Sequence, residues 1–250
     1  MGTTRVAVIG HRGASAEAPE NTIAAFERAL QLGADGIEFD VQLSSDGTAV
    51  VIHDAMLDRT TDGSGPVFHH DVDTLRGLDA GARFGSDFIG EPIPTLDEVL
   101  RLPAAVLELE IKTWGLAVLE AVLDEVDAAG VFDRVKFTGW NQSMLCRLKA
   151  ERPDATIGLF SQQPQPWMNE AVFERYVLGT AETAGFDVAH VYAGAITPSI
   201  ARGLHDLGYV VHANDAQGSD DVENALLAGV DSLSMDDVAM AMRLTGATGR

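Results

Sequence analysis

Short apolar runs alternate with segments of helical periodicity along most of the chain. The runs are rich in β-branched residues and are bounded by turn-forming residues, as strands are. Repeated strand–helix units of this kind predict a parallel sheet covered by helices. Nine runs are predicted as strands: Val6–Gly10, Gly36–Val41, Ala49–His53, Ala105–Ile111, Val135–Gly139, Thr156–Phe160, Val188–Tyr192, Tyr209–Ala213 and Ser232–Met235.

The clearest helical pattern covers residues 21–32, where Ile23, Phe26 and Ala29 recur at helical spacing. Glycines follow four of the predicted helices, at the position that helix C-caps favour: Gly33, Gly130, Gly208 and Gly229. Five more segments share the helical periodicity: Thr95–Leu102, Leu116–Ala129, Ser143–Glu151, Pro198–Leu207 and Val222–Ala228.

One pair of strands is expected to form a hairpin. Ser44-Ser45-Asp46-Gly47 is a tight-turn signal, so the strand at 49–53 should return antiparallel to the strand at 36–41. The other eight strands are the number that closes a (β/α)₈ or TIM barrel. An open doubly wound sheet is the alternative, although no GxGxxG or GxxxxGK[ST] motif supports a nucleotide-binding form of it.

Residues 54–94 carry neither a strong strand pattern nor a strong helix pattern. They contain Asp62-Gly63-Ser64-Gly65-Pro66 and Glu91-Pro92-Ile93-Pro94, and about forty irregular residues are unusual inside a compact domain. We therefore expect a single domain over residues 1–250 with a small insertion at about 54–94. The insertion either caps one end of the barrel or is a surface excursion.

The charge balance excludes some classes of partner. The 250 residues include 17 basic and 38 acidic side chains, which gives a formal net charge of −21. Such a surface repels nucleic acid and anionic membranes, so we expect no nucleic-acid partner and no stable membrane association. Any phosphate ligand needs a locally basic site. The oligomeric state stays open.

Cysteine content and hydropathy favour a cytoplasmic location. Cys146 is the only cysteine, which rules out an intrachain disulfide and argues against a cysteine-based zinc site. The apolar run Val6–Ile9 is too short for the core of a signal peptide. No stretch reaches the roughly 18 uninterrupted apolar residues of a membrane span.

Acidic side chains share one face of two predicted strands. Residues i and i+2 of a strand point the same way, so Glu38 aligns with Asp40. Glu108, Glu110 and Lys112 align in the same manner. Carboxylates that converge from two strands repel one another unless a cation lies between them, and oxygen ligands suit calcium or magnesium. The alternative is that these acids form only salt bridges with nearby basic residues.

Basic and titratable side chains end the neighbouring strands. His11 and Arg12 follow the first strand, and His53 ends the hairpin. Two histidines beside a carboxylate cluster supply a general acid and a general base near neutral pH, although a lone strand-end histidine is often structural. Arg12 and Lys112 supply fixed positive charge for an oxyanion or a phosphate.

Other polar residues have weaker assignments. The histidines at 69 and 70 lie in the irregular segment, while His190 and His205 have no partner that the sequence reveals. His212 either lines the cavity or packs in the core. Asp236 ends the last strand, where it acts as a helix cap or supports a catalytic side chain.

Five motifs follow one another in the first sixty or so residues: His11-Arg12-Gly13-Ala14, Ala18-Pro19-Glu20-Asn21-Thr22, Gly33-Ala34-Asp35-Gly36-Ile37-Glu38-Phe39-Asp40-Val41, Val51-Ile52-His53-Asp54 and Asp58-Arg59-Thr60-Thr61-Asp62-Gly63. Glu110-Ile111-Lys112 and Gly229-Val230-Asp231 continue the series in the second half of the chain, where the match is weaker. In these motifs, and from Val6 to about Asp237, the chain resembles the glycerophosphodiester phosphodiesterase family.

The resemblance implies a TIM barrel with a small insertion after the second strand. It also implies hydrolysis of small glycerophosphodiesters to glycerol 3-phosphate and an alcohol, through a cyclic phosphate that water opens. Three alternatives remain: a lyase that stops at the cyclic phosphate, a lysophospholipase D-type enzyme and a non-catalytic phosphodiester-binding barrel. The resemblance implies that a calcium or magnesium ion is bound by Glu38, Asp40 and Glu110. It also implies that the acid–base pair is His11 and His53, and that the phosphate is bound by Arg12 and Lys112.

Two positions depart from the family pattern. Asn214 stands where the family usually has a tryptophan after the seventh strand, so we expect a more polar or open pocket that favours small or polar head groups. Glu108 stands where many members have a neutral residue, and it either strengthens the metal site or repels the phosphate. Glu108, His212 and Asn214 are therefore candidate pocket-lining residues.

Overall fold

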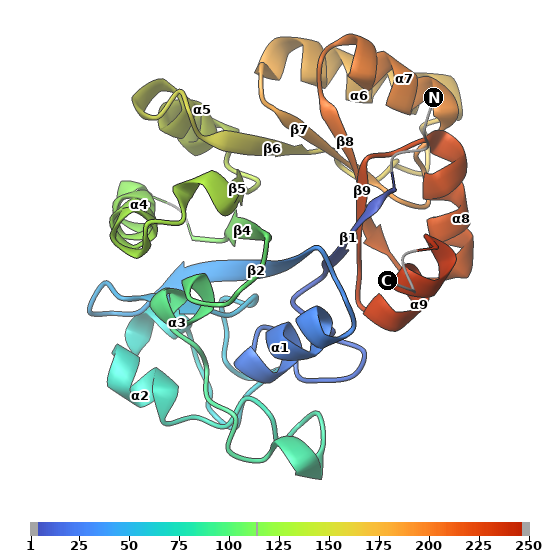
Figure 1. Ribbon diagram of the computed structural model, residues 1–250. Helices are drawn as coiled ribbons and strands as arrows, with labels where there is room; N and C mark the ends of the chain where they lie inside the picture. The colour runs from blue at the N-terminus through green and yellow to red at the C-terminus, as the bar shows by residue number, and fades with distance from the viewer. Residues whose placement is uncertain (1–4, 114, 247–250) are drawn as a thin grey trace.

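Eight parallel strands close into a barrel in the computed structural model, which describes residues 5–113 and 115–246 (Figure 1). The first strand, β1, pairs with both β2 and β9, which closes the ring and excludes the open sheet. The short strand β3 pairs antiparallel with β2, as the predicted hairpin requires. The strands are β1 (Ala7–Gly10), β2 (Gly36–Leu43), β3 (Ala49–Val51), β4 (Val106–Ile111), β5 (Val135–Thr138), β6 (Thr156–Phe160), β7 (Val188–Tyr192), β8 (Val210–Ala216) and β9 (Ser232–Met235).

All nine predicted strands are confirmed, and the largest difference is at β8. This strand runs three residues further than the predicted end at Ala213, through an irregularity in its pairing with β9 between Ala213 and Ala216. A bulge keeps a strand paired while it changes direction, which an alternation pattern does not reveal. The extension carries Asn214 to the mouth of the barrel.

Helices surround the barrel, and the six predicted ones are confirmed with small shifts at their ends. The sequence missed α2, α6 and α9. In α6 only Phe173, Val177 and Ala181 are buried, a stripe too narrow to give a clear periodic signal. The helices are α1 (Ile23–Gln31), α2 (Val72–Arg76), α3 (Leu96–Leu100), α4 (Leu116–Ala129), α5 (Gln142–Glu151), α6 (Glu170–Ala184), α7 (Pro198–Asp206), α8 (Ser219–Ala228) and α9 (Val238–Leu244).

Side-chain caps explain where several helices begin. The Thr22 hydroxyl accepts a hydrogen bond from the Ala25 amide at the start of α1, and Thr95 and Glu98 form a reciprocal capping box at the start of α3. At the other end of α4, Gly130 adopts a left-handed φ of 67°. Within the described ranges, no helix is both long and apolar enough to cross a membrane.

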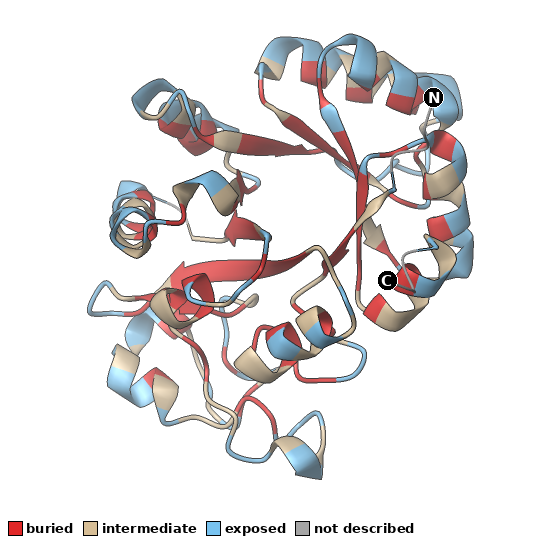
Figure 2. Ribbon diagram, viewed as in Figure 1, coloured by how far each residue is buried: buried red, intermediate tan, exposed pale blue. Residues whose placement is uncertain are grey.

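The main hydrophobic core lies between the strands and the helices. Ile37, Phe39 and Val41 of β2 are fully buried on its outward face, where Phe39 packs edge-on against Phe26 of α1. In Figure 2 most of the strand ribbon is coloured as buried, while the helices carry exposed segments. Because the apolar face of β2 points toward the helices, its acidic face points into the barrel.

Residues 54–94 contain α2 and two short 3₁₀ helices, at Val67–His69 and Ser86–Phe88. Leu57, Leu75 and Ile93 belong to a second core cluster that also includes Val50 of β3. The segment therefore folds around apolar side chains of its own. The expected domain of residues 1–250 also includes residues 1–4, 114 and 247–250, which lie outside the described residues.

Gly36 marks a close approach between β2 and β4. A Cβ atom at this position would lie 2.6 Å from the Val106 carbonyl oxygen and 2.7 Å from the Val106 Cβ. We expect Gly36→Ala to lower the free energy of unfolding by about 1–3 kcal/mol, the usual cost of overpacking. Chemical denaturation measures this change.

Gly179→Ala is the matched control. Gly179 is exposed within α6, and no atom lies within 4 Å of its added Cβ. This change should raise the free energy of unfolding by about 0.5–1 kcal/mol, because alanine costs less conformational entropy in a helix. A Gly36→Ala variant as stable as the wild type would contradict the close packing of β2 on β4.

Candidate active site

A cavity of about 180 Å³ opens where the C-terminal ends of the barrel strands meet. Barrel enzymes place their active sites at this end. Six of the residues predicted to act on metal or substrate line the cavity, together with Asn214. The full lining is His11, Arg12, Glu38, His53, Glu110, Lys112, Trp140, Phe160, Asn214 and Asp215.

Three carboxylates meet at the floor of this cavity. Glu38 and Asp40 lie on one face of β2, and the register between strands places Asp40 beside Glu110 of β4. All three side chains are buried, and one oxygen atom from each lies within 4.8 Å of the others. The structure therefore brings together the three residues predicted as metal ligands.

Two basic side chains offset part of this negative charge. Lys112 Nζ lies 3.1 Å from Asp40 Oδ1 and 2.6 Å from Glu110 Oε1, while Arg12 Nε lies 3.4 Å from Asp40 Oδ2. The ion pairs of the alternative interpretation therefore exist. Two cations face three carboxyl groups, so full ionisation of the three acids would leave one negative charge without a partner.

The ionisation of the acids reflects their surroundings. Burial and the nearby charge of Asp40 raise the pKa of Glu38 to about 8. Burial also disfavours the charged form of Asp40, but Lys112 and Arg12 outweigh it and hold the pKa of Asp40 below its usual range. Burial raises the pKa of Glu110 as well, so both Glu38 and Glu110 need additional positive charge to ionise.

The donor set fits a hard divalent cation. Asp40 Oδ1 and Glu110 Oε1 share one ammonium group, that of Lys112, and a carboxylate oxygen can accept more than one partner. Carboxylate oxygens without nitrogen or sulfur ligands favour calcium or magnesium over zinc. The three residues could therefore hold such an ion, which would also relieve their mutual repulsion.

Each candidate catalytic histidine is held by a carboxylate. His11 Nδ1 donates to Asp236 Oδ1 over 2.7 Å, and His53 Nδ1 donates to Asp54 Oδ1 over 2.6 Å. In both rings Nε2 is the nitrogen left for a ligand. Asp236 therefore supports His11, which is one of the two roles that the sequence left open for it.

The two imidazoles titrate in opposite directions from their ordinary value. Burial disfavours a charged His11, but the hydrogen bond with Asp236 and the charge of Glu38 outweigh burial and raise the pKa of His11 to about 9. Burial lowers the pKa of His53, and the charge of Lys112 acts in the same direction. At neutral pH the pair therefore contains one protonated and one neutral ring.

Sequence reasoning singled out neither Asn21 nor Asp215 as a site residue. Asn21 Nδ2 donates to Asp40 Oδ2 over 2.7 Å, and the Asp40 amide donates to Asn21 Oδ1. Arg12, Asn21 and Asp215 are the non-glycine residues with positive φ in the described chain, at 53°, 58° and 58°. Backbone strain of this kind concentrates at functional sites. The motif that contains Asn21 could have identified Asn21 as a site residue, whereas nothing in the sequence identified Asp215 as one.

Comparison with known proteins agrees with this geometry. Residues 11–240 match the Glycerophosphoryl diester phosphodiesterase family. The chain belongs to this family. It is 37% identical to a glycerophosphodiester phosphodiesterase of Caldanaerobacter subterraneus subsp. tengcongensis over 238 residues, which covers 92% of this chain and 93% of that relative.

Two solved structures extend the comparison. A phosphodiesterase from Oleispira antarctica in complex with the product sn-glycerol-3-phosphate superposes with a TM-score of 0.85 at 28% identity and covers 97% of each chain. A glycerophosphodiester phosphodiesterase from Agrobacterium tumefaciens str. C58 superposes with a TM-score of 0.79 at 28% identity, over 95% of this chain and 99% of its own.

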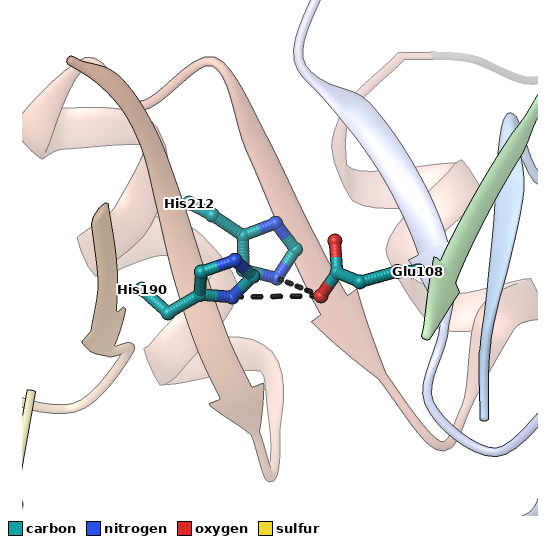
Figure 3. Close-up of side chains that lie close together, drawn as sticks. All are labelled: Glu108, His190 and His212. Atoms are coloured by element: carbon teal, nitrogen blue, oxygen red, sulfur yellow. Dashed lines mark ion pairs between the residues drawn. The ribbon is translucent and has the colours of Figure 1, made fainter. Parts of the chain in front are cut away.

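Two residues that were candidates for the cavity lining lie deeper in the barrel. Glu108 and His212 are fully buried inside the barrel and do not line the cavity. Glu108 precedes Glu110 by two residues on the same face of β4, so it lies one step deeper from the barrel mouth. Its carboxylate packs near His190 and His212 (Figure 3). His205, for which no partner was predicted, pairs with Asp231 on the surface.

An aromatic wall is present despite the asparagine at position 214. Asn214 lines the cavity, and the rings of Trp140 and Phe160 also line it. These two rings stack with centroids 5.2 Å apart and lie at the ends of β5 and β6. The missing tryptophan therefore does not leave the cavity without an apolar side, contrary to what the substitution alone suggested.

The support from Asp236 can be measured directly. We expect Asp236→Asn to lower the pKa of His11 in the folded protein, because the neutral amide no longer stabilises the imidazolium. Titration of the His11 ring signals by NMR at fixed metal concentration measures the shift. Asp154→Asn, in a surface ion pair with Arg152, is the control and should leave His11 unchanged. An unaltered His11 pKa in Asp236→Asn would refute the proposed support.

Proposed function

We propose that this protein is a metal-dependent phosphodiesterase that hydrolyses small glycerophosphodiesters to glycerol 3-phosphate and an alcohol. The observation that carries the proposal is that three buried carboxylates, two cations and two carboxylate-held histidines lie together, and that all of them except Asp40 line one cavity. The name of the Caldanaerobacter relative and the product bound to the Oleispira antarctica phosphodiesterase support the substrate class.

The charge of the site supports a metal requirement. With all three acids ionised and no metal bound, one net negative charge would remain beside Lys112 and Arg12, so Glu38 keeps its proton at neutral pH instead. A divalent cation held by Glu38, Asp40 and Glu110 would let all three acids ionise and would leave net positive charge to attract a phosphodiester anion. When bound, calcium or magnesium supplies positive charge toward a phosphate oxygen and an attacking hydroxyl group.

The protein's own side chains bind the phosphate and move protons. Arg12 and Lys112 donate hydrogen bonds to phosphate oxygens. One histidine of the pair His11 and His53 accepts the proton of the glycerol 2-hydroxyl as its oxygen bonds to phosphorus. The other histidine protonates the departing alkoxide as its bond to phosphorus breaks. Water then opens the cyclic phosphate with the same two groups in exchanged roles.

The histidine roles predict a specific kinetic result. His11→Ala and His53→Ala should each lower kcat by about 10²–10⁴-fold, the usual contribution of a positioned acid or base, with a much smaller change in KM. The assay is release of glycerol 3-phosphate in calcium or magnesium, with phosphorus NMR to identify the product. His205→Ala, remote from the cavity, is the control and should keep wild-type kcat.

Wild-type kcat in either variant would show that its histidine is not part of the reaction. Accumulation of a cyclic phosphate by the wild-type protein would instead favour a lyase. Absence of turnover by the wild type with every divalent ion would favour a phosphodiester-binding protein.

The leaving alcohol has an aromatic surface available to it. Trp140 is half exposed, and it and Phe160 separate the catalytic cavity from an adjoining hollow. That hollow has a largely polar lining: Trp140, Asn141, Gln142, Ser143, Phe160, Gln162 and Tyr176. We propose that the head group lies across the stacked rings toward this hollow, which suits small or polar alcohols.

Removing the exposed ring tests this placement. Trp140→Ala should raise KM about 3- to 10-fold for a glycerophosphodiester with a larger alcohol, because a half-exposed aromatic ring contributes part of the usual burial energy. It should change KM less for the smallest alcohols. Trp167→Ala removes a tryptophan that is 72% exposed and lines neither the cavity nor the adjoining hollow, and it is the matched control. Equal effects on small and large alcohols would exclude this path for the head group.

A further inference from the structure

A second polar cluster lies inside the barrel, apart from the catalytic cavity. Glu108 of β4 faces His190 of β7 and His212 of β8 (Figure 3). His190 Nδ1 lies 3.4 Å from Glu108 Oε1, and His212 Nε2 lies 4.0 Å from the same oxygen. All three side chains are 0–1% exposed, and none lines the cavity.

These side chains are poorly satisfied by the rest of the described protein. Glu108 Oε2, both ring nitrogens of His190 and Nε2 of His212 are buried without a hydrogen-bond partner. A buried unsatisfied polar group costs about 1–3 kcal/mol, so four such atoms in one place call for a bound species.

The spacing of the three groups matches that of metal ligands. One atom from each residue lies within 4.8 Å of the other two. Two ligands that bind an ion at 2.0–2.1 Å with a tetrahedral angle lie about 3.4 Å apart. The separations from Glu108 Oε1 are 3.4 Å and 4.0 Å, so a small shift of one imidazole completes the geometry.

We propose that Glu108, His190 and His212 form a second metal site, which takes a borderline transition ion such as zinc. Imidazole nitrogen suits this class of ion, whereas the oxygen-only site above it suits calcium or magnesium. The proposal is independent of the catalytic function, because the two sites share no ligand.

The surrounding residues hold both imidazoles in the required orientation. His212 Nδ1 lies 2.8 Å from Ser232 Oγ, which fixes the ring and leaves Nε2 toward Glu108. His190 fits only because residue 158 is glycine, since a Cβ there would lie 2.5 Å from His190 Nε2. That contact leaves His190 Nδ1 facing Glu108.

The electrostatic surroundings keep His190 in the form that binds metal. Burial and the positive charge of Lys136 lower the pKa of His190 to about 3, so its ring is neutral at physiological pH. A metal bound here would connect β4 with β7 and β8 across the barrel interior. Since none of the three ligands reaches the cavity, this metal would stabilise the barrel and would not act on the substrate.

Metal analysis tests the site. The wild-type protein is unfolded, refolded with zinc and dialysed against EDTA, and its zinc is measured by mass spectrometry. We expect about one retained zinc per chain, because the site is closed to the chelator. Glu108→Gln and His212→Gln should retain less than a tenth of that amount. His205→Gln removes a surface imidazole and Glu110→Gln removes a ligand of the other site; both should retain the zinc.

Refolding with cobalt keeps the test decisive if the core variants do not fold. Wild-type protein should then acquire the strong visible absorption of tetrahedral cobalt with nitrogen ligands, and Glu110→Gln should acquire it as well. Wild-type protein that retains no zinc and shows no such absorption would overturn the proposal, with water as the species in the cluster. Folded Glu108→Gln or His212→Gln protein that retains zinc would also overturn it.

Discussion

Repulsion among three buried carboxylates is the constraint on which the rest of the site depends. Glu38, Asp40 and Glu110 are brought together by the pleat of β2 and by its register with β4, and neither can change without disturbing the barrel. Lys112 and Arg12 offset two of the three charges, and Asn21 donates to Asp40. Because Glu38 has a pKa of about 8, the three acids can all be ionised at neutral pH only if further positive charge is present, which is the physical argument for the proposed divalent cation.

The same constraint extends to the residues around the carboxylates. The backbone of Arg12 and that of Asn21 adopt left-handed conformations that cost free energy. In these conformations the Arg12 amide donates to Glu38 Oε2 over 2.8 Å and the Asn21 side chain reaches Asp40. Part of the stability of the barrel is thus given up to hold the side chains that we propose to bind a cation and a phosphate.

Local patterns were sufficient for the strands and for the acids on a single strand. The alternation of β2 placed Glu38 and Asp40 on one face, and the hairpin turn removed β3 from the barrel count. The helix α6 was missed because most of its surface is exposed. The end of β8 was missed because a bulge depends on the neighbouring strand.

Contacts between side chains on opposite sides of the barrel could not be predicted from the sequence. The depth of a side chain inside the barrel depends on strand register and barrel closure, which no local pattern states. Glu108 and His212 were therefore candidates for the cavity lining, although both are buried below it. His190 lacked a partner for the same reason, since its neighbours come from β4 and β8. Trp140 and Phe160 likewise become one aromatic wall only when β5 and β6 lie side by side.

The dependence of product binding on a divalent cation tests the central claim most directly. Calorimetric titration of glycerol 3-phosphate should give measurable binding in calcium or magnesium. In excess chelator, binding should be at least about ten-fold weaker, because the phosphate then loses the positive charge of the cation. Equal affinity with and without the cation would contradict the claim that the three carboxylates require it.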